Sequence, residues 1–118
     1  MKKKQGKKAL KIIAAVLGAL LALYCAYYLI AAIAFGDSMP MPLGVGVAVV
    51  LTGSMEPELS ANDLIVVVRS SGYKLDDVVV YSTGGTPVVH RVIEIDGEHG
   101  VLTTQGDANN VADTPVSV

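Results

Sequence analysis

The sequence predicts a mainly β fold, in which a small β domain follows a single N-terminal transmembrane helix. Two observations lead to this prediction. The first is an uncharged run of 24 residues, 12–35, early in a chain of 118 residues. The second is that the rest of the chain consists of short runs rich in valine and isoleucine, separated by turn-forming residues, without a long apolar period of 3.6 residues.

The uncharged run Ile12–Phe35 is long enough to cross a bilayer. At about 1.5 Å per residue it spans roughly 36 Å of helix, compared with a hydrocarbon core of about 30 Å. Gly36 and Pro40 end the apolar pattern and open a linker, 36–44. A cleavable signal peptide with Ala32-Ile33-Ala34 as its cleavage site is the alternative, which the length of the run disfavours because a typical apolar region there has about 7–15 residues.

Charge is distributed unevenly about this run. Six lysines precede it, whereas the residues after it include only three basic side chains against all eleven acidic ones. Basic residues favour the cytoplasmic side of a membrane. We therefore expect a basic cytoplasmic tail at 1–11, a transmembrane helix at 12–35 and an extracytoplasmic domain at 45–118.

The β domain is predicted to contain five strands. Asp96-Gly97 is a strong hairpin signal between the last two of them. The apolar runs are continuous rather than alternating, which predicts strands that are covered on both faces or that lie with one face against the bilayer. The expected strands are Val45–Leu51, Asp63–Arg69, Asp77–Ser82, Val88–Ile95 and Gly100–Thr104.

A candidate nucleophile lies in the segment Gly53-Ser54-Met55-Glu56-Pro57, directly after the first apolar run. The exposed end of a buried strand is a suitable place for a reactive hydroxyl, because the scaffold beneath it is rigid. The alternative is a serine that only bonds its local backbone in a turn. Thr52 could add its hydroxyl to an oxyanion hole formed with the backbone N–H of Ser54, or could be an ordinary β-branched strand residue.

A candidate base lies in a strongly apolar segment, Val88-Val89-His90-Arg91-Val92. Imidazole titrates near neutral pH and therefore suits proton transfer. The alternative is a core histidine that bonds a backbone carbonyl. His99 lies beside the Asp96-Gly97 turn, and we assign it no role.

Two carboxylates compete for the role of orienting the base. Asp107 follows Gly106, and Asp113 comes six residues later. Aspartate also bonds its own backbone in turns, so turn formation is the alternative for both. Serine, histidine and aspartate follow one another in that order along the chain.

No cofactor or metal is expected. The single cysteine, Cys25, lies in the membrane run, and His90 and His99 have no neighbouring ligands at a zinc-site spacing. The lysines of the tail are explained by membrane anchoring, and we expect no nucleic-acid partner.

The serine, histidine and Gly106-Asp107 segments, preceded by a membrane run, resemble the type I signal peptidases. The similarity is greatest to the Ser/His branch, which is found in the endoplasmic reticulum, in archaea and in sporulation-type Gram-positive bacteria. In the commoner bacterial branch a lysine stands where His90 stands. The resemblance implies a signal-peptidase-like β domain in which Ser54, His90 and Asp113 are catalytic and Asp107 and Thr52 support them.

The resemblance also implies a function. The chain would be a membrane-bound serine endopeptidase that cleaves signal peptides from exported pre-proteins after small residues. Its partners would be those signal peptides and the lipid bilayer, with other membrane subunits as a further option. It would be located in the cell membrane, or in the endoplasmic reticulum membrane of a eukaryote. The alternatives are a non-catalytic, membrane-tethered subunit of an export complex and a same-fold protease with few clients.

Members of the family that the chain resembles normally continue with a further strand where this sequence ends. The domain is therefore expected either to be truncated at its C-terminus or to close with fewer elements.

The predicted topology can be tested by labelling introduced cysteines with an impermeant thiol reagent in intact cells, after replacement of Cys25. A cysteine at Lys3 should be protected because the tail is cytoplasmic, whereas one at Asp96 should react. The reverse pattern would contradict the orientation, and release of the β domain into the medium would favour a signal peptide.

Overall fold

The computed structural model describes residues 2–34, 36 and 39–118, with side chains from Gln5 onward. Phe35 of the predicted membrane span and Asp37 and Ser38 of the predicted linker lie outside the described residues, as does Met1. The chain forms two compact units, Met1–Pro42 and Leu43–Val118.

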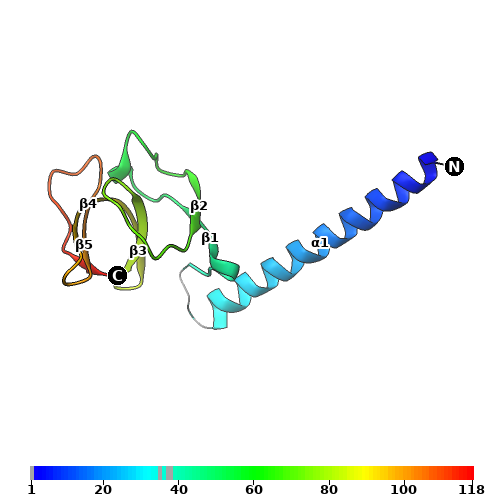
Figure 1. The fold of residues 1–118 in the computed structure, drawn as a ribbon, viewed down its shortest axis with the longest axis horizontal. Coiled ribbons are helices and arrows are strands. Elements are labelled where there is room, and N and C mark those ends of the chain that lie inside the picture. Colours follow the sequence, from blue (N-terminus) through cyan, green and yellow to red (C-terminus); the bar gives the residue numbers. More distant parts are fainter. Residues whose placement is uncertain (1, 35, 37–38) are drawn as a thin grey trace. The chain divides into compact units, whose positions relative to one another are not determined.

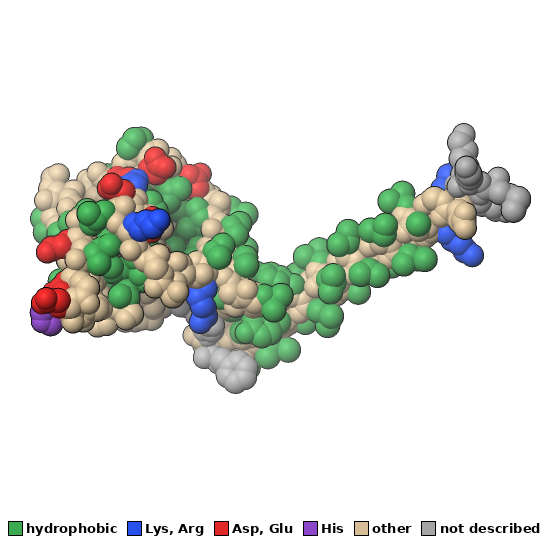
Figure 2. All heavy atoms as spheres, viewed as in Figure 1, with side chains coloured by type: hydrophobic (Ala, Val, Ile, Leu, Met, Phe, Trp, Pro, Cys, Tyr) green, Lys and Arg blue, Asp and Glu red, His purple; other side chains and the backbone are tan. Residues whose placement is uncertain are grey.

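The first unit consists mainly of one helix, α1, Lys2–Ala34. Among the described residues, the segment Gln5–Ala34 is the one helical stretch that is long and apolar enough to cross a membrane, with a mean hydropathy of 2.2. Hydrophobic side chains lie along the visible length of the helix (Figure 2), and a helix that is apolar on all sides is suited to lipid. Large exposed apolar residues such as Ile13, Leu17 and Leu21 illustrate this.

The second unit is a β domain built from two antiparallel sheets (Figure 1). Together with α1, it confirms the predicted fold class of a small β domain after a single N-terminal helix. One sheet pairs β1, Val45–Val49, with β2, Leu64–Val68. The other has the order β3-β4-β5-β6, with bounds Val78–Thr83, Thr86–Asp96, Val101–Gln105 and Val116–Ser117.

The five predicted strands are all present, with ends that differ by a few residues. The sequence did not predict β6, which has two residues and pairs with β5 through Leu102 and Val116. Such a short edge strand has no periodic pattern of its own. It forms because the chain beyond Asp113 returns alongside β5.

Of the two alternatives for the continuous apolar runs, cover on both faces does not hold for β1 and β2, which have one open apolar face. Alternate residues of β1, all valines, pair with Leu64, Val66 and Val68 of β2, so these side chains share one face of the sheet. On β2 the three side chains are 66–70% exposed. The residues between them in β2 are more buried. The continuous apolar run of β2 therefore forms a strand with one open face.

Two tight turns set the register of the larger sheet. Thr83 pairs with Thr86, so Gly84 and Gly85 alone join β3 to β4, with φ angles of 57° and 84°. This geometry is typical of a two-residue type I′ hairpin, which glycine adopts without strain. At the next turn, Oδ1 of Asp96 accepts hydrogen bonds from the backbone N–H groups of Glu98 and His99. This turn joins β4 to β5 in the hairpin that Asp96-Gly97 predicted.

The register determines which side chains share a face. Tyr81 of β3 pairs with Val88, and Thr104 of β5 pairs with Val92. Val88, His90 and Val92 alternate along β4 and therefore point to one face, with Tyr81 and Thr104 beside them. A one-residue bulge in β4 between Val92 and Glu94 shifts the pairing beyond this point. Val92 and Thr104 are fully buried, so this face is the core of the sheet.

Candidate active site

Ser54 lies in the middle of a 3₁₀ turn, η2, Gly53–Met55. The chain reaches this turn after Val50, whose backbone exchanges hydrogen bonds with Asp63 and Asn62. Thr52 has an extended backbone and caps the turn. Met55 is fully buried, which anchors the other end of the turn in the core while Ser54 stays partly accessible.

His90 lies in the middle of β4 and is 8% exposed. Its Nε2 is 3.2 Å from Oγ of Ser54, and its Nδ1 is 2.5 Å from Oδ2 of Asp113. Both ring nitrogens therefore face side-chain oxygens, which differs from a core histidine that bonds a backbone carbonyl. The structure thus brings together Ser54, His90 and Asp113, which lie far apart in the sequence.

The direction of these hydrogen bonds follows from the donor groups available. An ionised carboxylate only accepts, so Nδ1 of His90 carries the proton that Asp113 accepts. In a neutral imidazole Nε2 is then unprotonated and accepts from the hydroxyl of Ser54. The hydroxyl of Thr52 donates to Oγ of Ser54 over 3.1 Å, which leaves the proton of Ser54 available for His90.

Asp113 lies in a segment without regular secondary structure, between β5 and β6. Burial by itself raises the pKa of Asp113, but hydrogen bonds from His90, Thr104 and Tyr81 outweigh it and leave the pKa below its ordinary value. Asp113 therefore remains an anion beside His90.

Asp107 occupies a different position from Asp113. It forms a two-point ion pair with Arg91, from Nε to Oδ1 at 2.9 Å and from Nη2 to Oδ2 at 2.8 Å. The remaining terminal nitrogen of Arg91 donates to the backbone carbonyl of Asp76. These contacts tie β4 to the loop after β5 and to the loop before β3. Of the two acids that the sequence left in competition, Asp113 is the one that contacts His90.

Gly106 is buried where this loop passes the site. A Cβ atom at this position would lie 2.6 Å from the carbonyl oxygen of Ser54 and 2.9 Å from Nε2 of His90. Moreover, the carbonyl oxygen of Ser54 accepts a hydrogen bond of 2.9 Å from the backbone N–H of Ala108. The loop can approach Ser54 this closely only because residue 106 has no side chain.

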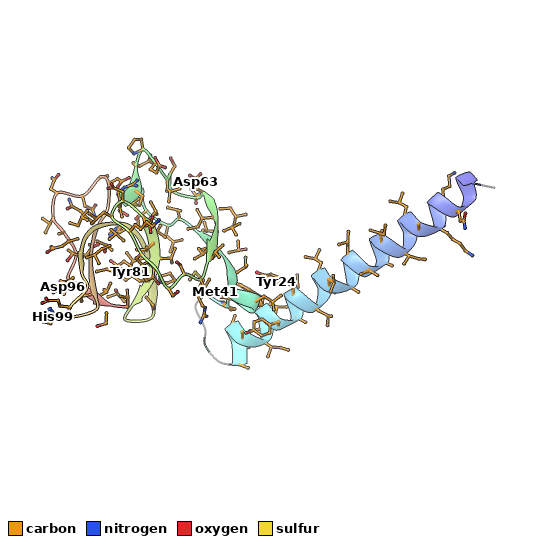
Figure 3. The ribbon with its side chains drawn as sticks, viewed as in Figure 1. Tyr24, Met41, Asp63, Tyr81, Asp96 and His99 are labelled. Carbon is orange, nitrogen blue, oxygen red and sulfur yellow. The ribbon has the colours of Figure 1, made fainter. Side chains whose placement is uncertain are left out.

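Thr52 is not a strand residue, because β1 ends at Val49. Its Oγ1 lies 3.5 Å from the backbone nitrogen of Ser54, and this contact caps the turn. His99 is 72% exposed and bonds Asp96 over 2.7 Å at the end of the β4–β5 hairpin (Figure 3). In the part of the chain that the structure describes, no cluster of three or more histidine, cysteine or acidic residues could hold a metal.

The sequence reasoning did not identify Tyr81 and Thr104, whose hydroxyl groups lie 3.1 and 2.7 Å from Oδ2 of Asp113. The sequence signal that could have identified them is the alternation of side chains between the two faces of a strand. Once β3, β4 and β5 are placed in register, both residues lie on the face that carries His90. The register depends on the hairpin turns and on the bulge, and the bulge has no clear sequence mark.

Replacing Gly106 by alanine should destabilise the domain, because backbone and buried side-chain atoms would have to move. Overpacking of this kind costs about 1–3 kcal/mol, which lowers the melting temperature of a small domain by about 4 °C or more. The measurement is thermal unfolding of the full chain in detergent micelles. Gly72→Ala and Gly97→Ala are matched controls with open space around the added atom. Identical melting of all three variants would contradict the close approach.

The ion pair of Asp107 predicts a dependence of stability on pH. Hydrogen bonds from Arg91 hold the pKa of Asp107 below its ordinary value, against a smaller opposing effect of burial. Because the pKa is lower in the folded state, the pair stabilises the fold above the unfolded value of about 3.9 and loses this effect as the pH falls through the folded value. Asp107→Asn should therefore melt below wild type near neutral pH, with a difference that narrows in acid. Glu94→Gln serves as a control, and a constant difference for Asp107→Asn would exclude the linkage.

The chain is similar to signal peptidases from fungi and from a bacterium. It is 39% identical over 75 residues to the signal peptidase complex catalytic subunit SEC11 of Metarhizium robertsii, covering 58% of this chain and 44% of that protein. It is 38% identical over 85 residues to signal peptidase I W of Bacillus subtilis, covering 66% of this chain and 45% of that protein. A third relative, SEC11 of Candida tropicalis, is 40% identical over 72 residues, covering 57% of this chain and 43% of that protein.

The chain thus spans less than half of the length of each of these relatives. No family model matches it, and no solved structure matches it significantly. The names of the three relatives nevertheless agree, since each is a signal peptidase or the catalytic subunit of a signal peptidase complex. Over the 57–66% of its length that these relatives match, the chain is similar to the type I signal peptidases.

Proposed function

We propose that this chain is a membrane-anchored serine endopeptidase that removes signal peptides from exported pre-proteins by cleaving after small residues. The observation that supports this proposal best is the continuous hydrogen-bonded connection Ser54–His90–Asp113, with distances of 3.2 and 2.5 Å. The names of the relatives support the reaction, since they are signal peptidases or catalytic subunits of a signal peptidase complex.

In the proposed mechanism, Oγ of Ser54 attacks the carbonyl carbon of the scissile peptide bond while Nε2 of His90 takes its proton. Asp113 stabilises the imidazolium that forms and holds its orientation through Nδ1. The tetrahedral intermediate collapses when His90 gives the proton to the leaving amine, which leaves the N-terminal part of the substrate as an ester on Ser54. Water then hydrolyses this ester with His90 again acting as the base.

The negative charge of the tetrahedral intermediate needs hydrogen-bond donors. The backbone N–H of Ser54 is suitable, because its contact with Oγ1 of Thr52 is long at 3.5 Å and can be exchanged for a charged oxygen. The hydroxyl of Thr52 would rotate from Ser54 toward the same oxygen. Both donors belong to the segment that carries the nucleophile, so they would require little rearrangement.

The membrane helix would contribute by confinement. An enzyme anchored through 12–35, with its β domain of 45–118 outside the cytoplasm, shares a surface with its substrates, which raises their effective concentration and limits their orientations. The substrate segment before the cleavage site would bind as an added strand. Shallow pockets for alternate side chains would then exclude large residues.

The proposed roles can be tested with the full chain, reconstituted in lipid vesicles, and a synthetic pre-protein. Ser54→Ala and His90→Ala should each lower the turnover by about 10³-fold or more, and the double variant should be no worse, because these residues act as a unit. Asp113→Asn should also be severe, because the amide no longer stabilises the imidazolium.

His99→Ala is the matched control, since this second histidine also bonds an aspartate but lies at an exposed turn. It should cleave like wild type. A folded His90→Ala variant with normal turnover would refute the mechanism. A wild-type chain that cleaves no faster than Ser54→Ala would favour the non-catalytic subunit.

A further inference from the structure

Two hydroxyl groups lie against the same carboxylate oxygen that His90 contacts. Oγ1 of Thr104 is 2.7 Å and Oη of Tyr81 is 3.1 Å from Oδ2 of Asp113. The two hydroxyl oxygens are 3.0 Å from each other. Tyr81 comes from β3 and Thr104 from β5, the strands on either side of the one that carries His90. The mechanism described above does not use either residue.

Thr104 contacts Asp113 twice. Its backbone carbonyl accepts a hydrogen bond of 2.8 Å from the backbone N–H of Asp113, in addition to the contact between the side chains. Thr104 is fully buried and lies in a paired strand, whereas Asp113 belongs to an irregular segment. The strand is therefore the rigid partner, and it determines where the carboxylate lies.

We propose that Tyr81 and Thr104 are positioning residues that hold the carboxylate of Asp113 in the orientation in which it accepts the Nδ1 proton of His90. This proposal rests on the proposed function of Ser54, His90 and Asp113. All three contacts converge on Oδ2. Rotation of the carboxylate group would break all three contacts together. The two hydroxyl groups therefore oppose this rotation, which would otherwise be opposed by His90 alone.

The same contacts favour the ionised form of Asp113. Hydroxyl donors stabilise a carboxylate without adding a positive charge that would compete with the imidazolium for it. The hydroxyl of Tyr81 stays protonated, because burial raises the pKa of this side chain. Asp107 and Arg91, whose segments also carry Gly106 and His90, bind each other. The proton that moves from Ser54 during the reaction would therefore remain on His90.

The proposal predicts a specific kinetic effect, measured with the full chain in lipid vesicles. Tyr81→Phe and Thr104→Val each remove one hydroxyl group and keep the shape of the side chain. Each should lower kcat by about tenfold or more, as expected for loss of a hydrogen bond to a charged group, with little change in KM. Thr104→Ser keeps the hydroxyl and should restore most of the activity.

Matched controls make the same chemical changes away from Asp113. Tyr73→Phe removes a hydroxyl that donates to the backbone of Ser70, and Thr103→Val changes the neighbouring residue on β5. Both should cleave like wild type. Loss of kcat in the controls equal to that in Tyr81→Phe and Thr104→Val would indicate general destabilisation and would overturn the proposal.

A second comparison separates positioning from other roles. In an Asp113→Asn background, Tyr81→Phe and Thr104→Val should cause no further loss of kcat, because they act through the carboxylate. Losses that multiply with that of Asp113→Asn would overturn the proposal. If Thr104→Val fails to fold, Tyr81→Phe provides the same test from the opposite strand.

A measurement without substrate separates this proposal from the proposed function. The proton on Nδ1 of His90 should exchange with solvent faster in Tyr81→Phe and Thr104→Val than in wild type, as measured by NMR of the full chain in micelles. Unchanged exchange in both variants would overturn the positioning role. If wild type cleaves no pre-protein, the proposed function fails, and the exchange rates still decide whether these hydroxyl groups hold Asp113.

Discussion

The hydrogen bond between Asp113 and His90 joins an irregular segment of the chain to the middle of a β-sheet. It lies at the centre of the site, because Oδ2 of Asp113 also contacts Thr104 and Tyr81, and the other nitrogen of His90 faces Ser54. If the carboxylate were displaced, the imidazole would lose the partner that determines which of its nitrogens carries the proton. The proposed proton transfer from Ser54 depends on that choice.

Backbone geometry makes this arrangement possible. The loop between β5 and β6 must pass close to Ser54 before it reaches Asp113, and the buried Gly106 allows this approach. The ion pair of Asp107 with Arg91 then fastens the loop to β4. Asp107 and Asp113 thus have different roles. Asp107 holds the loop against the sheet, and Asp113 contacts His90.

Much of this organisation can be predicted from local sequence. The 24-residue uncharged run, the valine-rich strands and the Asp96-Gly97 turn are signals that act over a few residues, and the structure has the helix and hairpin that they predict. Ser54, His90, Asp107 and Asp113 were identified from their segments, and their proposed catalytic roles remain to be tested. The sequence could not decide between the two acids, because that choice depends on the path of a loop past a neighbouring strand.

The features that could not be predicted are those that depend on register. Tyr81 and Thr104 are unremarkable strand residues until β3, β4 and β5 are aligned, and only then do they share a face with His90. The strand β6 has only two residues and no pattern of its own. For β2 the sequence left open whether both faces are covered or one lies against the bilayer, because a run of five apolar residues looks the same in either case.

The most direct test of this account is the protonation state of the two nitrogens of His90. The nitrogen NMR spectrum of the full chain with isotope-labelled histidine, assigned with a His99→Gln variant, reports which ring nitrogen carries the proton in the neutral form. The account predicts a proton on Nδ1, directed at Asp113, and an unprotonated Nε2 facing Ser54. A neutral His90 with its proton on Nε2 would contradict it, because that nitrogen could not then accept a proton from the serine.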